Sequence, residues 1–381
     1  MGTAVLKAVR LSLCFVALAL AACEEGPPAP DRGHADAANE QSVSSAADMR
    51  VARAAHTATR LRGGEVLVAG GFVEGEGEPL ASAELYEAPD GSFASIGGMT
   101  TPRQSHTATP LPDGRVLITG GYGTNGPLRS AETYDPSTRR FTPIGRMNAR
   151  RAGHEAVRLE DGRVLIVGGV GPGSAFLETA ELYDPQTGRF SSTAAMSVPR
   201  ESHTTTLLPD GRVLVAGGHV GREEDLQLYA SAELYDAATG HFARADDMTM
   251  PRHKHDAVRL ADGRVLIVGG ADERDDPRAF ETAEIYDPDT DEFRRTGNLN
   301  LARYKLRGTS VLLEDGRVVV AGGADVPEVY EPATGGFTRL SGSFGRTPLF
   351  AAAAGVQGGV LLCGGYSREG GPTETAWLVR P

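Results

Sequence analysis

Arginine and histidine recur in pairs three residues apart, and these pairs are the side chains of this sequence most able to do chemistry. The pairs are Arg53/His56, Arg103/His106, Arg151/His154, Arg200/His203 and Arg252/His255. Arg303 and Arg346 follow later in the chain, with Leu306 and Leu349 in place of histidine. Five imidazoles around a common axis could bind a transition metal. Because metal sites need only two to four convergent ligands, a structural role is favoured and no metal is assigned.

The structural alternative gives each residue a partner inside its own repeat. A recurrent histidine can bond a turn, and a recurrent arginine can pair with a recurrent glutamate. Those glutamates are Glu84, Glu132, Glu181, Glu233, Glu284 and Glu328.

Acidic loops are the other candidate for chemistry. They contain Glu74, Glu76 and Glu78, then Glu223, Glu224 and Asp225, and later Asp272, Glu273, Asp275 and Asp276. Calcium needs six to eight oxygen ligands, and none of these loops follows the EF-hand pattern. A solvated acidic rim is therefore favoured over a cation site. The sequence also contains no HExxH helix, GxSxG elbow, Walker loop or sialidase Asp box (SxDxGxTW).

The elements that position these residues form a repeat. Short apolar runs end in a glycine pair at Gly70, Gly120, Gly168, Gly217, Gly269, Gly322 and Gly364, with spacings of 42 to 53 residues. Before most pairs, Asp-Gly separates two short runs, as in HTATPLPDGRVLITGG from His106, which predicts a hairpin. A second hairpin follows, in which a tyrosine precedes a phenylalanine by seven residues, as in Tyr134 and Phe141. Four short strands in each of seven units predict a propeller.

These features resemble the Kelch repeat family, in which a glycine doublet follows an apolar strand and two aromatic residues follow in the next hairpin. The second aromatic residue is often tryptophan in that family, whereas it is phenylalanine here. The resemblance covers residues 43–381 and implies an all-β, seven-bladed Kelch-type propeller with four antiparallel strands per blade.

Closure of the ring is predicted from the two ends. The final ETAWLVRP matches ETAELYDP of residues 178–185, so the chain stops after the third strand of blade seven. We expect residues 43–47 to supply the fourth strand, because ring closure by an N-terminal strand leaves no free edge.

Variable loops are predicted to gather on one face. The connections between second and third strands differ in length and sequence, whereas the DGR and DPxTG turns of the other face are nearly constant. Binding residues usually lie on variable loops over a rigid scaffold. The segments that carry the arginine and histidine pairs also reach this face, so those ten residues are the candidate ligand-facing set.

The N-terminus predicts export and a lipid anchor. Lys7 and Arg10 precede an apolar stretch, and Leu20 to Cys23 resemble the lipobox of bacterial lipoproteins, which makes Cys23 the lipidation site. An ordinary signal with an incidental cysteine is the alternative. Residues 1–22 are then the signal and 23–41 a Pro-, Ala- and acid-rich tether before the propeller at 42–381. Glu24 after the cysteine resembles the default for the outer membrane of Gram-negative bacteria.

Composition limits the classes of molecule that this protein is expected to bind. The net charge is −12, which disfavours nucleic acid and leaves membrane contact to the lipid alone. We expect a monomer without a cofactor that binds or scaffolds an unidentified extracytoplasmic protein or glycan.

An enzyme is the alternative, because the resemblance extends to galactose-oxidase-like copper radical enzymes and sialic-acid mutarotases. The copper site of the former uses two tyrosines, two histidines and a cysteine, and Cys363 is the only thiol left for it. An enzyme should gather several ionisable groups, unlike the repeat consensus, in one pocket.

Overall fold

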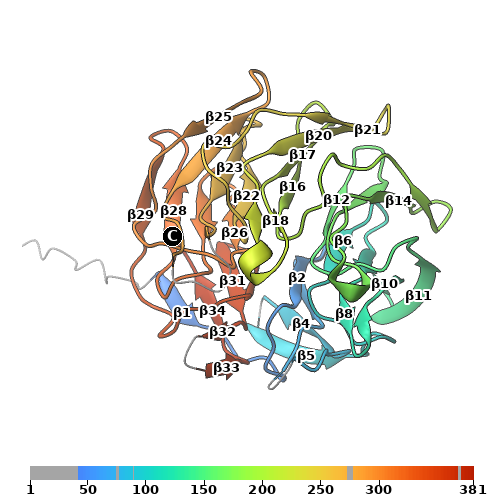
Figure 1. The fold of residues 1–381 in the computed structure, drawn as a ribbon. Coiled ribbons are helices and arrows are strands. Elements are labelled where there is room, and N and C mark those ends of the chain that lie inside the picture. Colours follow the sequence, from blue (N-terminus) through green and yellow to red (C-terminus); the bar gives the residue numbers. More distant parts are fainter. Residues whose placement is uncertain (1–41, 74–76, 89, 273–277, 368–369) are drawn as a thin grey trace, which may run out of the picture. The chain divides into compact units, whose positions relative to one another are not determined.

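The computed structural model describes residues 42–73, 77–88, 90–272, 278–367 and 370–381. Within these ranges, backbone pairing forms seven four-stranded antiparallel sheets and three two-stranded ones. The four-stranded sheets are arranged around a central channel (Figure 1). The all-β, seven-bladed propeller predicted from the sequence is confirmed.

Each blade runs outward from the channel in chain order. Blade 1 comprises β2 (Thr57–Arg60), β3 (Val66–Ala69), β4 (Ala83–Glu87) and β5 (Ser92–Ile96). Blade 2 comprises β6 (Thr107–Pro110), β7 (Val116–Thr119), β10 (Ser130–Asp135) and β11 (Arg140–Arg146). Blade 3 comprises β12 (Glu155–Arg158), β13 (Val164–Val167), β14 (Ala180–Asp184) and β15 (Arg189–Ser192). Blade 4 comprises β16 (Thr204–Leu207), β17 (Val213–Ala216), β20 (Ala232–Asp236) and β21 (His241–Arg244).

The remaining blades follow the same order except at closure. Blade 5 comprises β22 (Asp256–Arg259), β23 (Val265–Val268), β24 (Ala283–Asp287) and β25 (Glu292–Arg295). Blade 6 comprises β26 (Ser310–Leu312), β27 (Val318–Val320), β28 (Glu328–Glu331) and β29 (Gly336–Arg339). Blade 7 comprises β30 (Ala352–Val356), β31 (Gly359–Cys363), β34 (Ala376–Val379) and the N-terminal β1 (Val43–Ser45). Val43 pairs with Val379, so the predicted closure by the N-terminal segment is confirmed, over three residues.

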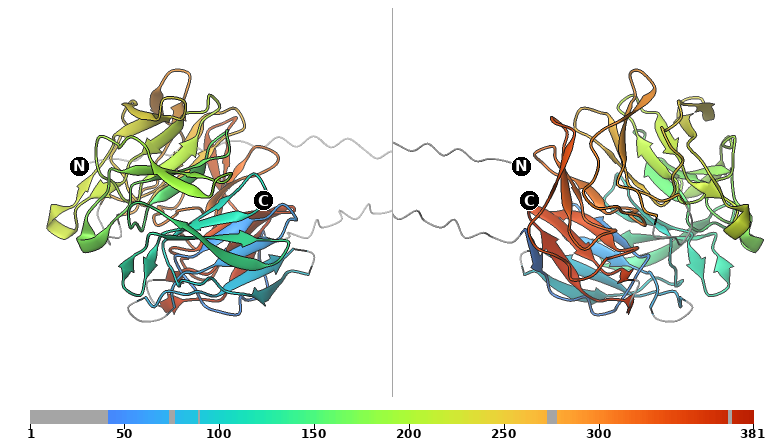
Figure 2. Two further views of the ribbon diagram at one scale, coloured as in Figure 1. Left: turned by 90° about the vertical axis from the view of Figure 1, so that its right-hand side faces the viewer. Right: turned by 60° about the vertical axis from the view of Figure 1, so that its left-hand side comes forward.

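Two faces of the propeller are distinguished by their connections. The loop face carries the connections between second and third strands, with the small strands β8 (Tyr122–Gly123), β9 (Gly126–Pro127), β18 (His219–Val220), β19 (Gln227–Leu228), β32 (Tyr366–Ser367) and β33 (Gly370–Pro372). The 3-10 segments η1 (Pro172–Ser174) and η2 (Glu223–Asp225) also belong to it. The turn face carries the Asp-Gly-Arg turns and the C-terminus. Figure 2 shows η2 and the C-terminus on opposite sides of the propeller.

The core lies between neighbouring blades. The second strands are fully buried, as in β7 (Val116–Thr119), and their side chains pack against the next blade. In six blades the recurrent tyrosine pairs across its hairpin with the recurrent phenylalanine, as Tyr134 does with Phe141 at a ring-centre distance of 4.9 Å. Since each cluster spans two blades, apolar burial is what holds the blades together.

Candidate functional site

Two side chains from each blade face the central channel on the loop-face side. The first is a residue of positive φ just before the inner strand, which we call the rim position: Ala55, Ser105, Gly153, Ser202, Lys254, Lys305 and Phe350. The second follows two residues later and is called the wall position: Thr57, Thr107, Glu155, Thr204, Asp256, Arg307 and Ala352. Backbone bonds join neighbouring rims; the Ser105 N–H, for example, donates to the Ala55 carbonyl at 2.9 Å.

Blades 3, 5, 6 and 7 depart from the common residues at these positions. The rim residue is small in the first four blades, whereas the last three blades have Lys254, Lys305 and Phe350 at this position. Walls are threonine in blades 1, 2 and 4, whereas Glu155, Asp256 and Arg307 replace it elsewhere. Non-glycine residues at positive φ are uncommon and carry strain, which makes long side chains at these rims notable. The seven-fold repeat thus carries one asymmetric, charged segment.

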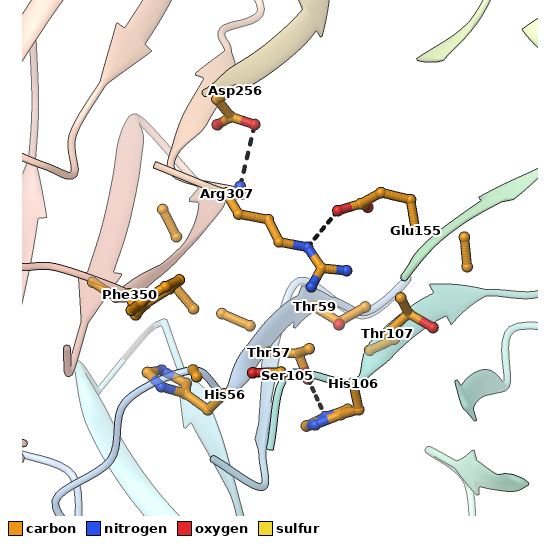
Figure 3. Close-up of a pocket in the computed structure, with 18 of the residues that line it drawn as sticks. His56, Thr57, Thr59, Ser105, His106, Thr107, Glu155, Asp256, Arg307 and Phe350 are labelled. Carbon is orange, nitrogen blue, oxygen red and sulfur yellow. Dashed lines mark hydrogen bonds and ion pairs between the residues drawn. The ribbon is translucent and has the colours of Figure 1, made fainter. Parts of the chain in front are cut away.

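These departures meet in two adjoining cavities. The outer cavity, of about 290 Å³, opens among the loops and is lined by Tyr122, His219, Arg222, Lys254, Lys305 and Tyr366. The inner cavity, of about 280 Å³, lies deeper in the channel and is lined mainly by threonine and alanine. Ser105, Glu155, Arg307 and Phe350 line both (Figure 3). A third cavity, of about 340 Å³, shares Ser105, Phe350 and Tyr366 with the outer one, and Phe72 adds a further aromatic side chain to its lining.

An ion pair crosses the channel where the two cavities meet. Arg307 Nε lies 2.6 Å from Glu155 Oε1, and Arg307 Nη2 donates to the His154 carbonyl at 2.6 Å. Arg307 belongs to blade 6 and Glu155 to blade 3, so the pair joins opposite sides of the ring (Figure 3). Burial raises the pKa of Glu155 to about 7, even though Arg307 favours its charged form, and the charge of Asp256 adds to the rise.

Asp256 organises the backbone that carries Arg307. Its carboxylate accepts the N–H groups of Gly308 at 3.2 Å, Thr309 at 3.0 Å and Ser310 at 2.8 Å. Burial raises the pKa of Asp256 to about 6, and these hydrogen bonds oppose the rise. The carboxylate therefore fixes the turn from which Arg307 reaches the channel.

Lys305 is held on the side of the outer cavity by aromatic rings. Its Nζ donates to the Tyr366 hydroxyl at 2.7 Å and lies 5.2 to 5.3 Å from the ring centres of Tyr304, Phe350 and Tyr366. Cation–π contacts of this kind hold the ammonium group in place beside the rings.

Blade 4 completes the wall of the outer cavity. Arg222 Nη2 donates to Glu201 Oε2 at 2.5 Å and its Nη1 to His219 Nε2 at 2.7 Å. Since arginine can only donate, His219 Nε2 is an acceptor and the neutral ring carries its proton on Nδ1. The Nδ1 atom of His219 lies 3.2 Å from Nδ1 of His253. Because the proton is on His219 Nδ1, His253 Nδ1 is the acceptor of this hydrogen bond.

The ten arginine and histidine residues proposed from the sequence lie inside the blades. Each of the five arginines, namely Arg53, Arg103, Arg151, Arg200 and Arg252, is fully buried and pairs with the recurrent glutamate of its blade at 2.6 to 3.0 Å. The same arginines also donate to the carbonyl of the first glycine of the doublet, as Arg103 does to Gly120 at 2.7 Å. Their guanidinium groups are thus bound within the blades.

Four of the five histidines contact the preceding blade, and His56 does so through the Cys363 sulfur of blade 7 at 3.5 Å. His106 Nε2 lies 3.2 Å from the Thr57 hydroxyl of the preceding blade, and His154 and His255 make the same contact to Thr107 and Thr204. Burial and the nearby arginine lower the pKa of all five, which are His56, His106, His154, His203 and His255, well below the usual value. All five are neutral rings, and His56, His106, His203 and His255 are among the residues that line the two cavities.

His203 differs because its wall partner is missing. Glu155 stands where blades 1, 2 and 4 place the threonine that contacts the next histidine, and His203 Nε2 is buried with no hydrogen-bond partner in the part of the chain that the structure describes. The glutamate therefore removes one link between blades, a local cost that a purely structural residue would not incur.

The alignment of blade 7 with the repeat, as predicted from the sequence, is wrong. Arg346 was aligned with the recurrent arginines and Leu349 with the histidines. The Gly323 N–H instead bonds to the Pro348 carbonyl, as Gly71 does to Arg103, so Pro348 occupies the arginine position. The buried Phe344, which takes the place of the recurrent methionine, sets this spacing.

A copper radical site does not fit the donor set. Cys363 is buried in β31, and burial raises its pKa to about 12. Its sulfur contacts His56 Nε2 at 3.5 Å and the Ala352 carbonyl at 3.6 Å, neither of which is a tyrosine ring. Over the described ranges, no group of three or more His, Cys, Asp or Glu side chains is placed to hold a metal ion.

Several expectations concern residues outside the described ranges. Cys23, the signal and the tether are among them, as are Glu74, Glu76, Glu273, Asp275 and Asp276 of the acidic loops. Glu223, Glu224 and Asp225 form η2 and are not buried. No helix of the described residues is long and apolar enough to cross a membrane.

Sequence reasoning did not identify the residues that line the outer cavity. Each of the charged residues follows a recurrent arginine within four residues: Glu155, Lys254, Lys305 and Arg307. They were missed because the sequence was compared for residues that recur in the blades and not for positions at which the blades differ. Comparing the wall position across blades would have separated Thr57 and its equivalents from the charged residues. The feature expected of an enzyme, several ionisable groups in one pocket that are unlike the repeat consensus, is present in this cavity.

Comparisons with known proteins agree with this architecture. The Kelch motif family matches residues 105–148. No protein of curated function matches the chain significantly. A solved structure described as a novel fungal alcohol oxidase of the AA5 family, in complex with copper, is similar with a TM-score of 0.71 and 17% identity, over 90% of this chain and 76% of that one. The structure of YjhT is similar with a TM-score of 0.59 and 12% identity, over 78% and 99%. The seven four-stranded sheets and these similarities show that the chain is a seven-bladed β-propeller, and its residues 105–148 match the Kelch motif.

Proposed function

We propose that this protein is a lipid-anchored envelope protein that binds a small polar molecule in the outer cavity. One observation carries the proposal: charged side chains that depart from the repeat gather in one cavity on the loop face. Residues that serve the blade recur in most blades, whereas lysine stands at only two of the seven rim positions, Lys254 and Lys305, and arginine at only one of the seven wall positions, Arg307. A concave site with convergent polar groups is the usual form of a small-molecule site.

The shape of the cavities fits a compact ligand. Serine and threonine residues, including Ser105, Ser202 and Thr107, line the same two cavities as the charged side chains. Phe350 and Tyr366 offer aromatic faces beside it. A ligand with several hydroxyl groups and one apolar face suits this combination, and a larger glycan or protein could present such a group to the loop face.

A thermal-shift assay tests the proposal. Glucose, glucuronate and glucose 6-phosphate are added in turn to the purified protein, and at least one is expected to raise the melting temperature in proportion to its occupancy. Arg222→Ala should weaken that effect at least tenfold, because Arg222 lines the outer cavity. Arg115→Ala is the matched control, since it removes an equally ion-paired arginine from a turn-face turn. No stabilisation by any of the three compounds contradicts the proposal.

Export and anchoring are tested separately. Metabolic labelling with an alkyne fatty acid should label the wild-type protein in a bacterial host and fail to label Cys23→Ser. Equal labelling of both proteins would exclude Cys23 as the anchor. We expect the unlabelled variant to be a soluble monomer.

Catalysis is the second candidate, favoured by the pKa of Glu155. A carboxyl group with a pKa of about 7 can accept and return a proton at neutral pH. Proton transfer, such as the opening of a sugar ring during anomer exchange, is the reaction class that this group supports. NMR of glucuronate with the protein should then show faster anomer exchange, which Glu155→Gln abolishes. An unchanged exchange rate leaves binding as the function.

A further inference from the structure

Arg307 and Glu155 form the only salt bridge that crosses the channel among the described residues. Both stand at wall positions where other blades carry threonine, and both line the outer and inner cavities. The Arg307 side chain is 33% exposed and lines the outer cavity, so a ligand there can reach it. The ion pair therefore lies at the floor of the proposed binding site.

The other acids near Arg307 have their own bonds. Glu201 is bonded to Arg222, and Asp256 accepts three backbone N–H groups of the turn that carries Arg307. Glu155 is thus the carboxylate that a ligand would meet at Arg307.

We infer that the bound molecule is an anion, a carboxylate or a phosphate, which takes the place of Glu155 on Arg307, and that binding places a solvent proton on Glu155. This inference rests on the proposed binding function and specifies the charge and position of its ligand. The proton comes from the buffer, and no other bond is made or broken.

Electrostatics explains why the two events are coupled. A ligand anion on Arg307 puts a second negative charge beside Glu155, and like charges at close range favour protonation. Arg307 from blade 6 and Asp256 from blade 5 face Glu155. The buried histidines beside it are His154 of its own blade and His203 of the next blade. Lys254 and Lys305 of the adjacent rims line the same cavity. Because burial already raises the pKa of Glu155 to about 7, protonation costs little near neutral pH.

Isothermal titration calorimetry of the purified protein measures the proton directly. Glucuronate and glucose 6-phosphate are the carboxylate and phosphate probes, and glucose is their neutral match. Titrations at pH 8 in HEPES and in Tris, which differ in ionisation enthalpy, should show uptake of about one proton per anion bound. Above pH 7 the apparent Kd of the anion should rise about tenfold per pH unit.

Variants separate the coupling from binding itself. Glu155→Gln resembles the protonated group, so it should bind the same anion at least as tightly as wild type, without proton uptake and without the rise in Kd. Arg307→Gln should lose at least tenfold in anion affinity. Asp113→Asn, which alters an arginine-paired carboxylate of the turn face, is the matched control and should behave as wild type.

The two possible failures are distinguishable. If none of the three compounds binds, the proposed function fails with the inference. If an anion binds without proton uptake, or if Glu155→Gln keeps the uptake, or if glucose binds as well as the anions, only the inference is overturned. Melting temperatures of each variant within a few degrees of wild type confirm that the comparison concerns folded protein.

Discussion

Each blade from the first to the sixth contains a buried arginine and a buried glutamate that are each other's counterions. Glu132, for example, accepts Arg103 Nη2 at 3.0 Å and the backbone N–H groups of Thr100 at 2.8 Å and Thr101 at 3.1 Å. The glutamate thereby holds the segment between two blades as well as the charge of the arginine. Removing one member of such a pair leaves a buried charge without its counterion.

We therefore expect Glu132→Ala to be strongly destabilising. The loss should be about 3 to 5 kcal/mol in the free energy of unfolding, measured by urea denaturation followed by tryptophan fluorescence. Arg115→Ala disrupts an exposed pair and should cost less than about 1 kcal/mol. Equal losses in the two variants would show that the buried pair has no special role.

Glu155 predicts a pH dependence of stability with a definite sign. Its pKa is about 7 in the folded protein and 4.5 for an unperturbed group, so the folded state binds more protons between these values. Stability that is present below pH 4.5 is therefore lost as the pH rises toward 7. Glu155→Gln cannot ionise, and its melting temperature should fall less than that of wild type between pH 5 and pH 8. Parallel curves for the two proteins would contradict the raised pKa.

At the scale of elements, the strands followed from the sequence because the repeat is strict. Asp-Gly turns, apolar second strands and the tyrosine and phenylalanine pair recur in nearly every blade, and each enforces a local conformation. Gly120 shows why its doublet is invariant: its φ is positive, and a Cβ there would lie 2.5 Å from the Arg151 carbonyl oxygen. Local constraints of this kind can be inferred from the sequence alone.

The residues of the outer cavity could not be predicted from the sequence in the same way. Glu155 and Arg307 are 152 positions apart, and only the closure of the ring brings blade 3 opposite blade 6. The register of blade 7 also failed, because Arg346 resembles the recurrent arginine while Pro348 holds its place. Local patterns predict strands, whereas convergence across the channel depends on the number of blades and their order.

Ring closure by β1 predicts a test at the element scale. Val43 is buried against Val379 and its neighbours in the core between blades 6 and 7. Val43→Asp should cost at least about 2 kcal/mol, the value of burying such a side chain, and should expose an unpaired strand edge. Chemical denaturation measures the first effect and light scattering the second. Ser44→Asp is the matched control, because Ser44 is exposed on the same strand.

For the whole molecule, the position of the N-terminal strand fixes the face on which the chain enters the propeller. β1 enters at Ser42, whose carbonyl accepts the Arg380 N–H at 2.7 Å, next to the C-terminus. Pro381 shares a cavity with Glu314 and Arg317 of a turn-face turn. The chain thus joins the propeller on the turn face, opposite the outer cavity.

A lipid at Cys23 would then direct the outer cavity away from the bilayer. Under the proposed anchor, only 18 residues separate Cys23 from Ser42 at the turn face, so we expect the turn face to stay nearer the lipid than the loop face. We expect a fluorophore on Glu314→Cys to be quenched by nitroxide-labelled lipids in vesicles more than one on Asn125→Cys at the loop face. The buried Cys363 should not compete for the label. Equal quenching would mean that the tether does not orient the propeller, and stronger quenching at Asn125→Cys would place the outer cavity against the membrane and exclude its access to soluble ligands.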